Sequence, residues 1–166
     1  MDGLSRELKK RRLRTHPDRV DLERSLQAIA RDFLARISKR VDFAWGSVSL
    51  LDRKTGLLRS VATRGEEMDF IVAFRFRFGN GLSAWALEHR KTVALRNIHH
   101  GRRHRHHPVR SFLTIPIVHE NVAIGTVTLA HRNAYAFTEQ ECRYLDRASR
   151  RLARLLFPIL YNEIEV

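Results

Sequence analysis

Two long apolar stripes with helical spacing, one near each end of the chain, constrain the fold more than any other feature. In the first, apolar residues recur every three or four positions over residues 18–41, at Leu22, Leu26, Ile29, Ala30, Phe33, Leu34, Ile37 and Val41. The second begins at a capping box formed by Thr138 and Glu141 and continues through Leu145, Ala148, Leu152, Leu155 and Ile159. Both spacings match one face of an α-helix. We therefore expect a helix at each end, with Pro158 limiting the length of the second.

Between these helices the apolar pattern takes the period of β-strands. We expect strands over residues 44–52, 57–63, 71–78, 92–95, 112–118 and 122–131. The first two flank a loop that contains glycine, and the last two flank residues 119–121, so each pair is typical of a hairpin. Ser83 is predicted to cap a short helix over residues 84–88. Helices at the ends and short strands between them indicate an α+β fold.

Composition and charge exclude several classes of protein. The chain has 166 residues and one cysteine, Cys142, which excludes an intramolecular disulfide and a CxxC motif. The longest apolar runs, residues 112–118 and 122–130, are far shorter than the ~20 residues that span a bilayer. No apolar segment of a secretory signal follows the charged N-terminus. We expect a basic leader at residues 1–16, one domain at 17–166, no membrane partner and a cytoplasmic location.

Four segments of the chain have a recognisable pattern. They are WGSVSLLDRKTGLLRSVATRG at 45–65, RFGNGLSAWALEHRKTVALRNI at 77–98, SFLTIPIVHENVAIGTVTLAHR at 111–132 and FTEQECRYLDRASRRLARLL at 137–156. Together they resemble a known sensory family, the GAF domain. The resemblance covers about residues 20–160. It implies a six-stranded antiparallel sheet with the terminal helices on one face and a small-molecule pocket on the other. Short helices and the loop at 97–110 would cover that pocket, and the terminal helices would pair in a homodimer.

The residues argue against several branches of this family. Bilin-binding members attach their chromophore to a pocket cysteine, and methionine sulfoxide reductases need several, whereas Cys142 lies on the final helix. The pattern of the cyclic-nucleotide phosphodiesterase members is not found, and no catalytic constellation stands out. We therefore expect a protein that is not an enzyme. The sequence identifies no cofactor and no metal.

The segment from His89 to His119 has the most unusual composition in the chain. It contains no Asp or Glu, seven Lys and Arg residues and seven of the nine histidines. A metal site, an anion site, a solvated loop and a nucleic-acid contact are all compatible with this composition. The anion site would use arginine forks, which grip carboxylate or phosphate. The candidate ligand-binding residues are Phe76, Trp85, His99, His100, Arg102, Arg103, His104 and Thr114.

Two of these candidates, Phe76 and Trp85, also have structural explanations. Phe74, Phe76 and Phe78 alternate with arginine, which is typical of a strand with one face in the core, and an isolated tryptophan often anchors packing. The apolar stripes of the two terminal helices also have two explanations. They can pair two copies in a homodimer, or they can pack against the sheet of a single chain.

The sequence favours a non-enzymatic sensory or regulatory module. It would bind a small ligand, for which an anion is one candidate, and signal through its terminal helices to a partner or to an output domain. The alternative is a protein that binds nucleic acid, or a scaffold without a ligand, that uses the strongly basic surface. The formal net charge of +13, from 31 Lys and Arg against 18 Asp and Glu, motivates that alternative.

Overall fold

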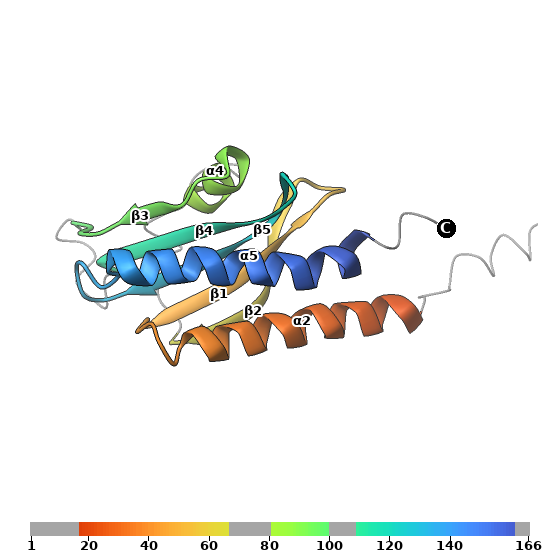
Figure 1. The fold of residues 1–166 in the computed structure, drawn as a ribbon, viewed down its shortest axis with the longest axis horizontal. Helices are drawn as coiled ribbons and strands as arrows, with labels where there is room; N and C mark the ends of the chain where they lie inside the picture. Colours follow the sequence, from red (N-terminus) through yellow and green to blue (C-terminus); the bar gives the residue numbers. More distant parts are fainter. Residues whose placement is uncertain (1–16, 67–80, 100–108, 162–166) are drawn as a thin grey trace, which may run out of the picture.

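The computed structural model describes residues 17–66, 81–99 and 109–161. Its elements are α2 (Pro17–Ile37), β1 (Trp45–Asp52), β2 (Leu57–Gly65), α4 (Leu82–His89), β3 (Val93–Leu95), β4 (Ser111–His119), β5 (Val122–His131) and α5 (Glu139–Tyr161). The strands form an antiparallel sheet in the order β2-β1-β5-β4-β3. Figure 1 shows α2 and α5 side by side on one face of this sheet. The predicted α+β fold is therefore confirmed.

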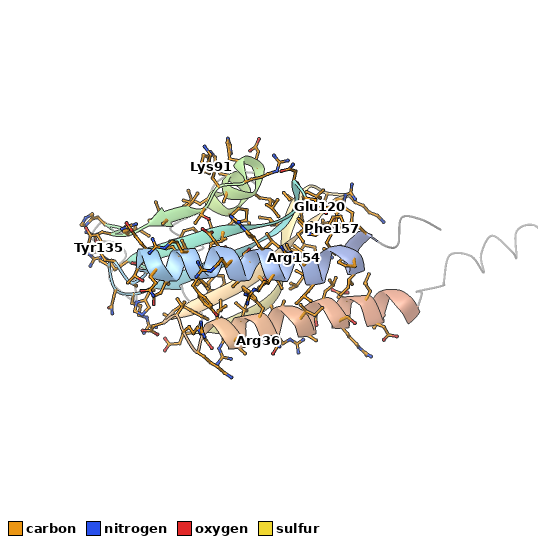
Figure 2. The ribbon with its side chains drawn as sticks, viewed as in Figure 1. Arg36, Lys91, Glu120, Tyr135, Arg154 and Phe157 are labelled. Atoms are coloured by element: carbon orange, nitrogen blue, oxygen red, sulfur yellow. The ribbon has the colours of Figure 1, made fainter. Side chains whose placement is uncertain are left out.

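The sheet differs from the expectation in its number of strands. Among the described residues it has five strands rather than six. The strand expected over residues 71–78, which includes Phe76, lies outside the described residues. The predicted hairpin between β4 and β5 is confirmed. Figure 2 labels Glu120 in its turn. The φ angles there are positive, 45° at Glu120 and 67° at Asn121, as a two-residue hairpin turn requires.

The main hydrophobic core lies between the sheet and the two terminal helices. Strand alternation turns Leu113 of β4 and Val127 of β5 toward the helices, where both are fully buried. They meet Leu34 of α2 and Leu145 and Leu156 of α5, which are also fully buried. Burying one such side chain contributes roughly 1.5–3 kcal/mol. The apolar stripes that predict the helices therefore cover the sheet.

The start of α5 is confirmed and its end is not as expected. The amide of Glu141 donates to Thr138 Oγ1 at 3.2 Å, and the amide of Thr138 donates to the Glu141 carboxylate at 2.8 Å, which completes the capping box. The helix continues through Pro158 to Tyr161. Proline removes one helical hydrogen bond, but Leu156 and Leu160 pack against the core on either side and hold the last turn in place.

Two β-bulges lie on either side of β1. Val48 pairs with Ala62 and Ser49 with Ser60, so Val61 is an extra residue in β2. Similarly, Ile124 is an extra residue in β5, between the paired residues Gly125 and Ala123. A bulge turns the extra side chain to a new direction and increases the twist of its strand. Both extra side chains lie on the helix side of the sheet, against the main core.

Gly125 permits the close approach of β5 and β1 beside the bulge. A Cβ atom at this position would fall on the carbonyl oxygen of Ser49 in β1. Any side chain here must push the two strands apart, because a backbone atom cannot move away as a flexible side chain does.

We expect Gly125→Ala to lower the free energy of unfolding by about 1–3 kcal/mol, measured by urea denaturation. Gly81→Ala is the matched control, because a Cβ at Gly81 meets no atom of the described residues within 4 Å. Equal unfolding midpoints for the two variants would contradict the role of Gly125 in strand approach.

Candidate functional site

The face of the sheet opposite the two long helices carries a cluster of hydroxyl groups. Thr114 of β4 and Thr128 of β5 stand opposite each other in the strand register, and both are buried. Their hydroxyls are 3.1 Å apart, and Ser83 Oγ lies 3.1 Å from that of Thr128 and 3.3 Å from that of Thr114. The three side chains therefore form one hydrogen-bonded group between α4 and the sheet.

The placement of Ser83 corrects a prediction from the sequence. The N-cap of α4 is Gly81, with no side-chain hydrogen bond, and Ser83 lies in the first turn of the helix. Its hydroxyl reaches the two threonines of the sheet instead. A serine in a helix can serve packing as well as capping, and here its hydroxyl joins α4 to the sheet.

A fourth hydroxyl on this face, that of Thr126, has no hydrogen-bond partner among the described residues. Thr126 is fully buried and lies two residues before Thr128, on the same face of β5. Leaving a buried hydroxyl unsatisfied costs about 1–3 kcal/mol, and such groups are rare in native proteins. Within the described part of the chain, the hydroxyl of Thr126 therefore stays unsatisfied, next to the paired hydroxyls of Ser83, Thr114 and Thr128.

A cavity of about 620 Å³ lies beside the hydroxyl cluster, between α4 and the hairpin of β1 and β2. Its walls are mainly apolar and include Leu51, Leu57, Leu87 and Ala123, while Ser83 is shared with the hydroxyl cluster. Two charged side chains, Glu88 and Arg90, also line it. Most of the wall thus suits an apolar group, and a few polar atoms are placed to orient it.

The structure places three of the predicted ligand-binding residues. Thr114 belongs to the hydroxyl cluster. Trp85 is 44% exposed and stacks on the ring of His89, with 4.2 Å between the ring centroids, so it does not line the cavity. His99 is exposed. The other predicted residues lie outside the described part of the chain, namely Phe76, His100, Arg102, Arg103 and His104.

Sequence reasoning missed three residues of this face, Ser83 as a contact of the sheet and both Thr126 and Thr128. A signal for the threonines was present. In β5 they alternate with Val127 and Leu129, which predicts a strand with a hydroxyl face and an apolar face. The contact with Ser83 could not be predicted, because it joins residues 45 positions apart.

The described residues contain no group of three or more acidic, histidine or cysteine side chains arranged to hold a metal ion. Within the same residues, no helix has the length and apolar character needed to cross a membrane.

The unsatisfied hydroxyl predicts opposite effects for two similar substitutions. Thr114→Val removes hydrogen bonds to two partners, so we expect it to lower the free energy of unfolding by about 1–3 kcal/mol. Thr126→Val removes a hydroxyl without a partner and keeps the shape, so the ligand-free protein should stay as stable or gain about 1 kcal/mol. Chemical denaturation measures both, and an equal loss in the two variants would contradict this assignment.

Comparison with known proteins identifies the fold. A model of the GAF domain matches residues 23–156. No curated protein sequence matches. One similar solved structure is the type II free methionine-R-sulfoxide reductase of Thermoplasma acidophilum, with 16% identity over 82% of this chain and 94% of that chain and a TM-score of 0.66.

Two other similar structures are GAF domains. That of a GAF domain/HD domain protein from Geobacter sulfurreducens has 17% identity, covers 82% of this chain and 95% of that chain, and has a TM-score of 0.63. The GAF domain of a phosphoenolpyruvate-protein phosphotransferase from Coxiella burnetii has 18% identity and a TM-score of 0.63, and the match covers 93% of this chain and 92% of that chain. The matched residues run from α2 to α5 and include every strand described above, so this chain belongs to the GAF domain family.

Proposed function

We propose that this chain is a non-enzymatic sensory or regulatory module that binds a small molecule on the α4 face of its sheet. The observation that carries the proposal is the buried Thr126 hydroxyl, which has no partner among the described residues. A ligand with a hydrogen-bonding group at that position would remove the cost of this hydroxyl. The cavity of about 620 Å³ beside Ser83 supports the proposal, because ligand pockets usually measure roughly 300–1,000 Å³.

An anionic ligand is a separate part of this proposal. It rests on the acid-free composition of residues 89–119. Of the cations in that segment, Arg90 lines the cavity, and its Nε donates to the backbone carbonyl of Asn121 at 3.0 Å. Glu88 lines the same cavity and offsets that charge. An anion would therefore need the positive charge of the loop at 97–110, which includes the exposed His99.

The absence of enzyme activity is also a proposal, since some structurally similar proteins are free methionine-R-sulfoxide reductases. The chain has one cysteine, Cys142. It packs against the main core on the helix side of the sheet, away from the hydroxyl cluster. Burial raises the pKa of the Cys142 thiol, which lowers the fraction of reactive thiolate at neutral pH. These properties support a structural cysteine.

Pairing of two copies through the terminal helices stays part of the proposal, on a narrower basis than the sequence suggested. Leu145 and Leu152 of the predicted seam are buried in the core of a single chain. Leu155 is 59% exposed and is the seam residue that remains open to a partner. A homodimer that signals through α2 and α5 would therefore contact at Leu155.

The test begins with native mass spectrometry of freshly purified protein, which reports a retained ligand and the number of copies together. A thermal-shift screen of small metabolites then supplies a ligand for calorimetry. We expect Thr126→Val to weaken binding of that ligand about three- to tenfold, the value of one neutral hydrogen bond. Thr92→Val is the control, because the hydroxyl of Thr92 donates to the Asp146 carboxylate of α5 at 2.9 Å, on the other face of the sheet. Equal affinity of wild type and Thr126→Val for the ligand would contradict the proposed site. A screen in which no compound binds would contradict it as well.

The outer face of α5 supports nucleic-acid binding as a second candidate function. Five exposed arginines lie on it, at Arg143, Arg147, Arg150, Arg151 and Arg154. Figure 2 shows Arg154 on α5 and Arg36 on α2, the two helices that cover the sheet. On α2, Arg36 lies 2.8 Å from the Asp32 carboxylate, whereas on α5 only Arg143 forms an ion pair among the described residues. The other four arginines are available to phosphates.

This second candidate predicts a salt-dependent interaction with duplex DNA, measured by fluorescence anisotropy. Replacing Arg147, Arg150 and Arg154 with Gln should lower the slope of log affinity against log salt by up to about 3, at roughly 0.9 per phosphate contact. The control removes three charges from α2 by changing Arg24, Arg31 and Arg36 to Gln. No binding at ~50 mM salt, or equal slopes for the two triple variants, would exclude α5 as the contact.

A further inference from the structure

A groove lies on the helix side of the sheet, between the first half of α2, the hairpin of β1 and β2, and the last turn of α5. Its volume is about 320 Å³. The walls are apolar side chains from both helices and three strands, including Leu22, Leu26, Leu50, Val61, Ile124 and Leu160. The hydroxyl cluster and the cavity beside α4 lie on the opposite face of the sheet. The groove is therefore a second candidate site, independent of the proposed function.

The two β-bulges explain why the groove is present at this end of the core. Val61 and Ile124 are the extra residues of the bulges, and they line the groove on either side of Leu50. Bulges increase the twist of a strand. The groove thus lies where the extra residues of both bulges reach the helix side of the sheet, and its floor is apolar.

The mouth of the groove carries two cations without a carboxylate partner among the residues described. Five charged side chains line the groove, from Glu23, Asp52, Arg53, Lys54 and Arg59. Glu23 pairs with Arg59 at 3.4 Å. The Asp52 carboxylate accepts hydrogen bonds from the backbone amides of Lys54 and Thr55, at 2.9 and 3.4 Å. The charges of Arg53 and Lys54 remain available to an anion.

The surroundings of Arg53 place its charge at the apolar wall. Its guanidinium carbon lies 4.9 Å from the ring centroid of Tyr161, which also lines the groove. An arginine held over an aromatic face keeps its five N–H donors at the edge of the guanidinium plane, where they can bind a carboxylate. Hence a positive group borders a mainly apolar groove, an arrangement that suits an anion with an apolar tail.

We propose that this groove binds an amphiphilic carboxylate, with its acyl chain along Leu22, Leu50 and Ile124 and its carboxylate at Arg53 and Lys54. The volume of 320 Å³ is at the small end of the usual range for ligand pockets, so the groove fits a short, single chain better than a protein segment. The carboxylate end follows from charge complementarity, because the three cations Arg53, Lys54 and Arg59 outnumber the two carboxylates of Glu23 and Asp52 at the mouth by one charge.

The test uses hexanoate, octanoate and decanoate with the full chain, in calorimetric titrations below the concentrations at which these probes form micelles. Each buried methylene should tighten binding about fourfold until the groove is full. Octanamide keeps the chain and removes the charge, so it should bind at least tenfold more weakly than octanoate. Affinity that does not depend on chain length would overturn the proposal.

Variants separate the groove from other sites. The double variant Arg53→Gln and Lys54→Gln should bind octanoate at least tenfold more weakly than wild type and bind octanamide with unchanged affinity. Arg31→Gln, on the exposed side of α2, should change neither affinity. Leu22→Phe should narrow the groove and shift the best probe to a shorter chain. Thr126→Val should leave octanoate binding unchanged, because that residue belongs to the opposite face. Thermal melts check that each variant folds.

Two outcomes would assign the groove to another occupant or leave it without one. Glu163 and Glu165 follow Tyr161 in the sequence, and their carboxylates have the charge that would pair with Arg53 and Lys54. If octanoate binds only after both are changed to Gln, the chain's own C-terminal residues occupy the groove and the proposal is wrong. It is also wrong if octanoate binds the Arg53 and Lys54 double variant as tightly as wild type.

Discussion

The alternation of side chains in β5 is the constraint on which the other features of the structure depend. Val127 and Leu129 point toward the long helices and are fully buried in the core. Thr126 and Thr128 point to the other face, where α4 packs. Because β5 lies in the middle of the sheet, between β1 and β4, it separates a dry apolar layer from a layer of hydroxyl groups.

A buried hydroxyl layer stabilises the fold only when its groups are paired. Ser83, Thr114 and Thr128 meet this condition among themselves, and their hydrogen bonds hold α4 on the sheet. Thr126 does not meet it among the described residues. A valine there would keep the shape without the cost of an unsatisfied hydroxyl. Among the described residues, packing alone therefore does not explain a threonine at this position.

Features that depend on local sequence were predictable. The capping box of α5, the β4–β5 turn and the alternation in the strands each involve residues within a few positions of one another. Features that depend on tertiary register were not, such as the contact between Ser83 and Thr128 or the bulges at Val61 and Ile124. A bulge is decided by the pairing of two strands, and the apolar pattern of one strand does not contain that information.

The basic composition was visible in the sequence, but its distribution was not. On α2, Asp21 and Asp32 lie one turn from Arg24 and Arg36 and pair with them, at 3.7 and 2.8 Å. On α5 the acidic residues Glu139, Glu141 and Asp146 precede most of the arginines. The two helices cover the same face of the sheet, so this asymmetry makes α5 the more positive of the pair. Repulsion between two such helices opposes their direct contact, and this weakens a homodimer built on α5 unless an anion lies between the copies.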